Sequence, residues 1–432
     1  MANHTLILPV IQNWSCHNCG GCCREHLIEI TDAEKKRIED QKWTTADGTP
    51  ADRPLIQQIG RGRYRLAHQD DGACVFLDSN GLCRIHAKFG EPAKPLACRV
   101  YPYAFHPISG NLTISLRFSC PSVVQNLGQR VVEQKPDLLQ LAKLITADSQ
   151  KSFEPPAIHG NQKVDWADIQ EFLTAFDEEL SDDSVNFATR LMRILTWLEL
   201  VEQSTFDKVR GNRLKEYLGV LTKASRKAQP DNDLPVLKPS RIGRILFRML
   251  VAQLLRHDTE ATARGGLSTR FGLLRAGLKF TFAIGRVPKF QESVSVTKVF
   301  GGSTDSKQSP RFADLESPYN GRTNEIDRLM TRYFRVKIQG LHFCGAANFD
   351  WNLVDGFRSL ALMYPATLYI ARLRASRQQR PQLELSDVQA ALATLDHNYA
   401  YSPATGSASA LQRIRILARL QQVTALCGWY TQ

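Results

Sequence analysis

The chain has 432 residues, ten cysteines and a formal net charge of +12, and 43% of its residues are hydrophobic. A chain of this length can bury a large core, and we expect two or three domains. Its most apolar stretch, residues 271–284, is interrupted by Arg275 and Lys279, so a membrane-spanning helix is not expected. The start of the chain lacks the basic and apolar regions of a signal peptide. We therefore expect a cytoplasmic protein rather than a secreted disulfide framework.

Eight of the ten cysteines lie within the first 120 residues, and four of them form the run Cys16-His-Asn-Cys19-Gly-Gly-Cys22-Cys23. Buried thiols that serve only as small hydrophobic side chains have no reason to recur at two-residue spacing. A redox C-x-x-C motif would need only two of these cysteines. The first third of the chain is therefore predicted to hold a metal ion or an iron–sulfur cluster.

The spacing within this run suits a ligand cage. In C-x2-C both sulfurs can face one ion, and Gly20-Gly21 are expected to allow a tight, positive-φ turn that brings in Cys22. Adjacent Cys22 and Cys23 point apart, so one of them is expected to serve this site and the other to pack or to reach a second site. C-x2-C-x2-C also opens a bacterial ferredoxin motif, for which Cys120-Pro121 supplies the remote Cys-Pro pair. The pattern favours a [4Fe-4S] cluster and leaves zinc open.

The other four cysteines of the N-terminal third stand in separate local contexts. Cys74 and Cys83 flank an Asp-Ser-Asn-Gly turn, which predicts a β-hairpin with the two thiols opposite each other. Cys98 lies in a segment bracketed by prolines. Residues 111–118 alternate apolar and polar side chains and predict a strand that delivers Cys120. We expect these four thiols to converge in space on the first four.

The whole pattern resembles the zinc- or iron-chelating CxxCxxCC domain family over residues 14 to about 121. It consists of C-x2-C-x2-C-C, two cysteines around a turn, C-R-x-Y-P and a final cysteine. The resemblance implies a metal site built from eight cysteines: Cys16, Cys19, Cys22, Cys23, Cys74, Cys83, Cys98 and Cys120. The family includes flagellin lysine-N-methylases. The resemblance therefore also suggests a protein lysine N-methyltransferase that uses S-adenosylmethionine together with an iron–sulfur cluster.

Two residues of the C-R-x-Y-P segment are candidates for cofactor binding. Arg99 and Tyr101 would contact a ligand such as S-adenosylmethionine beside the cluster, or would instead hydrogen-bond the sulfurs and tune the cluster's potential. A methyltransferase also needs a base for the lysine amine, and Tyr101 and Tyr103 are the candidates within the motif. The chain has no glycine-rich nucleotide-binding motif, so the binding site of a methyl donor stays unassigned.

A function from another class remains open. The chain can equally be a non-enzymatic iron–sulfur or zinc protein, in which the cluster stabilises the fold or senses redox state and the helical region binds a partner. Two isolated cysteines are expected to be buried, and five histidines near the motif are expected to form hydrogen bonds rather than to bind metal. They are Cys344, Cys427, His17, His26, His68, His86 and His106.

The predicted fold class is α+β. We expect residues 1–125 to form a small, loop-rich cysteine-cluster domain with a short antiparallel sheet, and residues 126–432 to be mainly helical. Apolar periodicity predicts helices over 123–146, 165–180, 185–201 and 241–256, and a final helical block over 324–426 that is interrupted at Gly345 and Pro365.

Charge is uneven along the chain. Residues 205–300 carry 19 Lys or Arg and 7 Asp or Glu, and the resulting +12 equals the formal charge of the whole chain. A basic surface attracts phosphates, anionic lipid, nucleic acid or an acidic protein. We expect mainly a solvated face, with Arg241, Arg244 and Arg248 on one side of a helix. A protein substrate or an acidic partner is the alternative, and nucleic acid is not expected.

Overall fold

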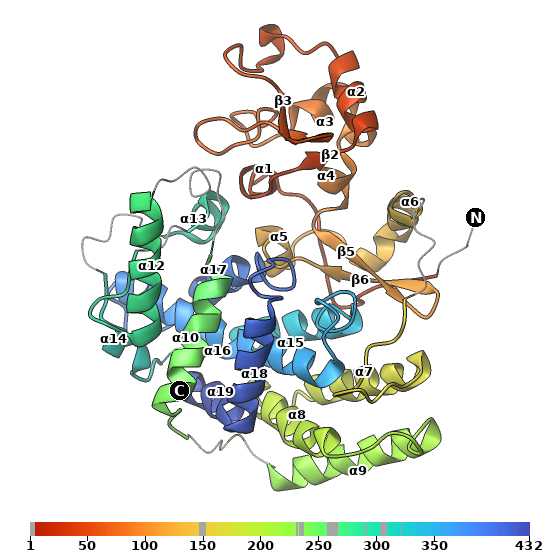
Figure 1. The fold of residues 1–432 in the computed structure, drawn as a ribbon, viewed down its shortest axis with the longest axis vertical. Helices are drawn as coiled ribbons and strands as arrows, with labels where there is room; N and C mark the ends of the chain where they lie inside the picture. The colour runs from red at the N-terminus through yellow and green to blue at the C-terminus, as the bar shows by residue number, and fades with distance from the viewer. Residues whose placement is uncertain are drawn as a thin grey trace.

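The computed structural model describes residues 5–146, 153–229, 232, 237–256, 267–289, 292–302, 309–320 and 322–432. The expected fold class is confirmed, because short sheets near the N-terminus are followed by a mainly helical region. Figure 1 shows a small upper part, which we call the head, above a larger body of helices. The head contains α1 (Cys22–Glu25), β2 (Glu29–Ile30), α2 (Asp32–Asp40), β3 (Ile56–Gly60), β4 (Arg63–Leu66), α3 (Arg84–Phe89) and α4 (Leu96–Val100).

Each part has its own three-stranded sheet. The head sheet has the order β2-β4-β3 and is antiparallel throughout. The second sheet has the order β1-β6-β5, with β1 (Leu6–Ile7), β5 (Tyr103–Ile108) and β6 (Asn111–Leu116). Here β5 and β6 form an antiparallel pair, whereas β1 runs parallel to β6. Strand β6 confirms the strand predicted from the alternation over 111–118.

The body is built from helices that the periodicity predicts in part. They are α5 (Pro121–Val124), α6 (Lys135–Thr146), α7 (Trp166–Leu180), α8 (Phe187–Glu202), α9 (Asn212–Ala228), α10 (Arg241–Leu254), α12 (Leu267–Phe282), α13 (Val294–Phe300), α14 (Phe312–Glu316), α15 (Asn324–Gln339), α16 (Leu353–Arg377), α17 (Leu385–Asp396), α18 (Ala408–Arg419) and α19 (Gln422–Thr431). Helices α7, α8 and α10 confirm three of the predicted segments to within two residues at each end.

Two helix predictions were wrong. The single helix expected over 123–146 is divided between α5 and α6, because Asn126 (φ 58°) and Gly128 (φ 94°) adopt left-handed conformations that end a helix. Conversely, Pro365 does not interrupt the chain but lies within the 25 residues of α16. Nearly the whole of α16 is buried, so tertiary packing offsets the hydrogen bond that proline cannot donate.

The described residues form two hydrophobic cores. The small one lies in the head and is made by Ile30, Ile38, Leu66, Ala67, Cys74, Val75, Phe76 and Ile85. The large one joins β5 and β6 to the helices, so that Phe118 meets Tyr333 edge-to-face at 4.9 Å. A core as small as that of the head gives little stability by itself, and metal sites often supplement such cores. The domain boundary near residue 125 stays a prediction.

The basic segment is only partly solvated. Arg241 is exposed, but Arg248 is 5% exposed, donates to the carbonyl of Thr281 at 2.9 Å and pairs with Glu316 at 3.3 Å. The expectation of a solvated face was therefore wrong for Arg248, because α12 packs on this side of α10. Within the described part of the chain, no helix has the length and apolar character needed to cross a membrane.

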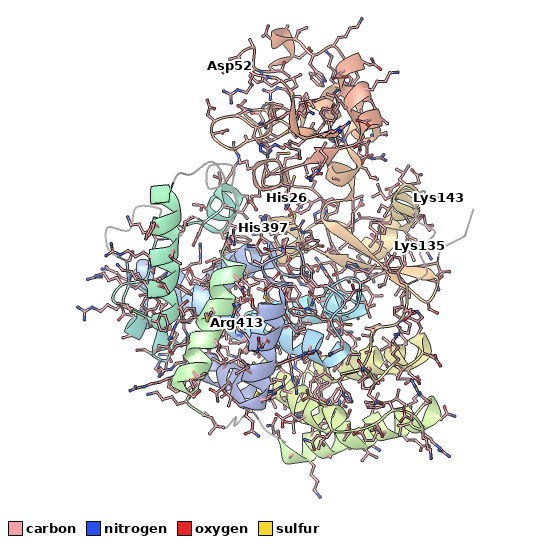
Figure 2. The ribbon with its side chains drawn as sticks, in the orientation of Figure 1. His26, Asp52, Lys135, Lys143, His397 and Arg413 are labelled. Carbon is pink, nitrogen blue, oxygen red and sulfur yellow. The ribbon has the colours of Figure 1, made fainter. Side chains whose placement is uncertain are left out.

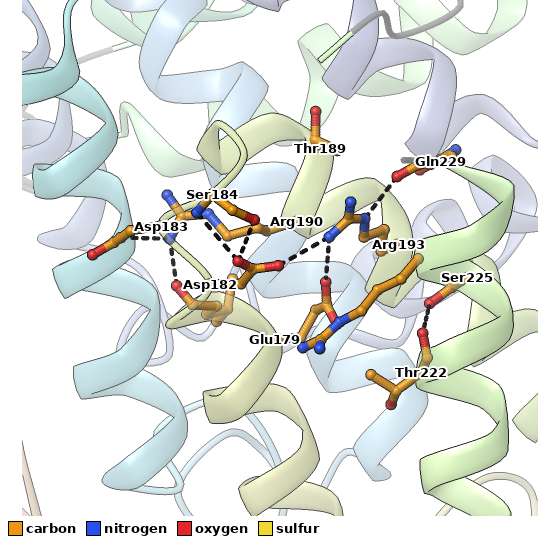
Figure 3. A network of polar contacts seen from close by, with 12 residues as sticks. Glu179, Asp182, Asp183, Ser184, Thr189, Arg190, Arg193, Thr222, Ser225 and Gln229 are labelled. Atoms are coloured by element: carbon orange, nitrogen blue, oxygen red, sulfur yellow. Dashed lines mark hydrogen bonds and ion pairs between the residues drawn. The ribbon is translucent and has the colours of Figure 1, made fainter. Parts of the chain in front are cut away.

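A buried ionic network joins α7, α8 and α9 (Figure 3). Glu179 is fully buried and accepts from Arg193 at 3.3 Å and from Arg226 at 2.8 Å. The guanidinium of Arg193 is only 4% exposed, and it also pairs with Asp182 at 3.2 Å. The network therefore ties α9 to both α7 and α8.

Replacing Glu179 by alanine should lower the free energy of unfolding by about 3 kcal/mol, because it removes the fully buried carboxylate that pairs with both Arg193 and Arg226. Urea denaturation followed by circular dichroism measures this change. The control is Asp183→Ala. Its carboxylate lies 3.5 Å from Arg190 but its side chain is 92% exposed, so a change below about 0.5 kcal/mol is expected. Equal effects of the two substitutions would contradict a structural role for this network.

Candidate metal centre

The Cys16–Cys23 run forms a tight loop that ends in α1. Asn18 (φ 53°) and Gly20 (φ 72°) adopt left-handed conformations, which reverse the chain between Cys19 and its neighbours. Gly21 does not, since its φ is −59°, so the positive-φ turn expected at both glycines occurs only at Gly20. Gly21 is needed for space instead. A Cβ there would lie 2.6 Å from the Cβ of Ser295 in α13.

The later cysteines stand at the ends of short elements. Cys83 and Cys120 precede α3 and α5, Cys98 lies within α4, and Cys74 follows the head sheet. The predicted hairpin was wrong in detail, because Leu77 rather than Cys74 lies opposite Cys83. Residues 74–77 turn back toward the loop, and the Cys74 amide donates to the carbonyl of Cys23 at 2.7 Å.

All eight cysteines of the motif line one cleft of about 1650 Å³ between the head and the body. The thiols lie on two sides of it, with Cys120 in the core of the body and Cys74 in the core of the head. Cys120 interacts electrostatically with Cys19, which in turn interacts with Cys16 and Cys22. We call Cys16, Cys19 and Cys120 the lower thiols.

A second group lies on the head side of the cleft. Cys74 interacts with Cys98 and Cys83, and we call these three the upper thiols. The sulfurs of Cys22 and Cys23 are 3.9 Å apart and stand between the two groups. Cys22 interacts with members of both.

Cys74 and Cys120 are buried, Cys16 is exposed, and the other five thiols of the motif are partly buried. Burial raises the pKa of Cys74, Cys98 and Cys120 to about 12. The pKa of Cys22 lies well above its ordinary value because its sulfur hydrogen-bonds the Cys23 thiol and is buried. These thiols are therefore protonated at neutral pH. A bound metal ion would displace their protons, because it stabilises the thiolate form.

The donor set fits a soft or borderline metal, since sulfur ligands select zinc, copper(I) or iron–sulfur clusters. Among the residues that the structure describes, no three Cys, His, Asp or Glu side chains already form a group that could hold a metal ion. Metal binding would thus require the thiols of a group to draw closer together.

The cysteine loop is held against the body by residues far apart in sequence. Ser295 of α13 donates a hydrogen bond to Glu25, and the imidazole rings of His26 and His397 stack at 5.2 Å, as Figure 2 shows at the junction of head and body. His397 Nδ1 lies 3.7 Å from Glu25 Oε2. Burial, with the nearby Arg117, lowers the pKa of His26 well below its ordinary value, so this imidazole is neutral at pH 7.

The two predicted cofactor contacts both line the cleft, with different surroundings. Arg99 pairs with Glu91 at 2.9 Å and is partly buried. Tyr101 packs against His26 at 4.7 Å and shares a hydrogen bond with Ser119 at 3.2 Å. Burial raises the pKa of Tyr101 well above its ordinary value.

The sequence did not single out two further residues of the cleft. The guanidinium of Arg117 lies 3.8 Å from the ring centroid of Tyr401 and 5.6 Å from that of Tyr101, and it donates to the carbonyl of His397 at 3.0 Å. The position of Arg117 three residues before Cys120 is a local signal for it. Tyr401 comes from a loop 281 residues after Cys120 and has no such signal.

Comparison with known proteins gave a match over the cysteine-bearing part of the chain. Residues 15–121 match the CxxCxxCC family, described as "Putative zinc- or iron-chelating domain". The chain is also 24% identical over 124 residues to a Lysine-N-methylase of Salmonella typhimurium, a match that covers 27% of this chain and 30% of that relative. No solved structure was found to match. Residues 15–121, which contain all the cysteines of the cleft, are thus similar to a domain family that is described as zinc- or iron-chelating.

Proposed function

We propose that the cleft holds two metal centres, each bound by four cysteines. The first uses the lower thiols Cys16, Cys19 and Cys120 together with Cys22. The observation that carries this proposal is that Cys120 belongs to the large core of the body, whereas Cys74 belongs to the core of the head with Cys23 and Cys83 packed against it. Four thiolates per centre match the ligand number of zinc sites and of [4Fe-4S] clusters.

Cys23 completes the second centre with the upper thiols Cys74, Cys83 and Cys98. Its side chain packs against the head core, to which Cys74 belongs and on which Cys83 also packs. Its carbonyl accepts the amide hydrogen bond from Cys74. Cys120, in contrast, is part of the large core of the body. These contacts support placing Cys23 with the upper thiols, while Cys22 lies close to thiols of both groups.

We assign a [4Fe-4S] cluster to the first centre, with zinc as the alternative. The spacing C-x2-C-x2-C with a remote cysteine before Pro121 is the arrangement of bacterial ferredoxins. The second centre has four cysteines far apart in sequence, which suits a structural metal that ties the small head together.

We further propose that the cleft is the site of methyl transfer to a protein lysine. The support is the similarity to a Lysine-N-methylase over part of the chain, together with the size of the cleft. Ligand pockets of roughly 300–1000 Å³ hold drug-sized molecules, so a cleft of about 1650 Å³ has room for S-adenosylmethionine and an entering side chain. S-adenosylmethionine supplies a sulfonium methyl group, which bonds to the neutral, deprotonated lysine Nζ as a neutral thioether leaves, and the lysine proton passes to water.

In this proposal, the residues around the thiols bind and orient rather than take protons. Burial raises the pKa of both Tyr101 and Tyr103, so their phenols stay protonated and do not act as bases at neutral pH. Arg99 and Tyr101 would contact the ligand at the edge of the cleft. The guanidinium of Arg117 stands beside them, on the ring of Tyr401.

The experiment is methyl transfer by anaerobically purified, metal-loaded protein, with radiolabelled S-adenosylmethionine and flagellin. We expect label on lysine, and a loss of about tenfold or more in the Tyr101→Phe variant, since the hydrogen bond to Ser119 orients this ring beside the thiols. Cys344→Ser is the matched control, because Cys344 is buried in the body and does not line the cleft. Metal-loaded protein that transfers no methyl group would favour the non-enzymatic alternative, a structural or redox-sensing cluster.

A further inference from the structure

Helix α12 carries a row of exposed apolar side chains. Phe271, Leu274, Leu278 and Phe282 are 73%, 59%, 50% and 53% exposed. Their spacing of three, four and four residues places them on one face of the helix. Ile284, which is 56% exposed, continues the row beyond the end of α12. We call these five residues the outer stripe.

The outer stripe is not the face by which α12 joins the protein. Phe280 points to the other side, is 6% exposed, and meets the rings of Phe312 at 5.8 Å and Tyr369 at 6.1 Å. The helix packs on α10 and stands at the edge of the molecule in Figure 1. A helix whose inner face is already packed has no internal use for a second apolar face. Contiguous exposed apolar surface of this kind marks an interaction site.

The surroundings of the stripe are strongly basic. Residues 261–290 contain six Lys or Arg and no Asp or Glu. Four of the cations, Arg275, Lys279, Arg286 and Lys289, line an open hollow of about 760 Å³ with Gly272 and Ser309. Its lining includes no acidic side chain. Arg275 and Lys279 belong to α12 itself, so the hollow adjoins the stripe.

We propose that α12 docks on an anionic phospholipid surface. The outer stripe would enter the boundary between headgroups and acyl chains, and the basic hollow would take lipid phosphates. Apolar side chains beside Lys and Arg on one helix are the combination that binds anionic membranes, where each cation near the surface adds to affinity. A second copy of the chain fits less well, because it would bring the cations of two hollows together. The inference does not depend on the metal centres or on methyl transfer.

The test is flotation of the full chain with vesicles of phosphatidylcholine alone or with phosphatidylglycerol added at about one part in three. Binding is expected only to the anionic vesicles and should weaken as salt is raised. The double variants Phe271→Ser/Leu274→Ser and Arg275→Gln/Lys279→Gln should each bind at least about tenfold more weakly. These side chains are exposed or half-exposed, so folding is not expected to suffer.

Matched controls come from α9, in the same basic segment. Val220→Ser removes an apolar side chain that is 64% exposed, and Lys215→Gln/Lys223→Gln removes two exposed cations. Both should bind like the unchanged protein. The proposal is overturned by absence of binding to anionic vesicles, or by equal weakening in the α9 controls. It is also overturned if the α12 variants bind vesicles normally but lose self-association or capture of an acidic protein.

Discussion

Replacement of Cys19 by serine is expected to empty the first metal centre. Cys19 interacts with Cys16, Cys22 and Cys120, so its loss removes one of four ligands and disturbs the other three. Serine is a hard donor and does not replace a thiolate. With two centres, the protein should lose the metal of the first centre and retain that of the second, because the upper thiols keep their own ion.

Metal analysis after anaerobic purification measures this loss, and absorption near ~400 nm shows whether iron–sulfur is the species lost. The companion variant Cys98→Ser should remove the metal of the second centre instead, and Cys344→Ser should change neither metal content nor spectrum, since Cys344 is fully buried in the body. If Cys19→Ser alone removes all metal, a single shared centre replaces the two-centre assignment. Equal metal content in Cys19→Ser and Cys344→Ser would exclude a ligand role for Cys19.

The second large effect is expected at a buried ion pair beneath the cleft. Lys337 of α15 and Asp396 at the end of α17 are both inaccessible to solvent, and their charged atoms are 2.8 Å apart. Asp396 also accepts from the amide of Ser119 and from the hydroxyl of Tyr333, each at 3.1 Å. Asp396→Asn should therefore lower the free energy of unfolding by about 3–5 kcal/mol, because it leaves the buried ammonium unpaired.

The pH dependence of this variant distinguishes an unpaired charge from a general packing defect. Burial lowers the pKa of Lys337 below its unfolded value, so at intermediate pH the folded chain binds fewer protons than the unfolded chain. The contribution of Lys337 to the free energy of unfolding therefore rises with pH until the pKa of the unfolded-state lysine is reached, and it falls as the pH decreases. Since Asp396 opposes the shift, its removal should strengthen this dependence.

Urea denaturation at pH 7 and pH 9.5 measures the effect, and the loss should be smaller at the higher pH. The control is Lys337→Met/Asp396→Asn, which removes both charges and should recover part of the lost stability. A double variant no more stable than Asp396→Asn would show that the lost hydrogen bonds, rather than the charge, account for the effect.

The amino-acid sequence by itself determined which residues could bind metal and what kind of fold surrounds them. Thiolate chelation depends on residue type and short spacing, both of which are local, so the C-x2-C-x2-C-C run indicated its chemistry without coordinates. The same holds for α7, α8 and α10, whose apolar periodicity is a property of one segment. Sequence periodicity failed to predict a helix end that depended on one or two backbone angles, as at Asn126 between α5 and α6.

Only the tertiary structure decided how the thiols are grouped and what encloses them. Three contacts join residues that are about 100 to 370 positions apart in the sequence. They are Cys120 near Cys19, Ser295 against Gly21, and the ring of His26 stacked on that of His397. No local pattern encodes such pairs, because they result from the packing of the head against the body. The free energy of that packing comes from burial summed over many side chains, and the geometry of the cleft is its consequence.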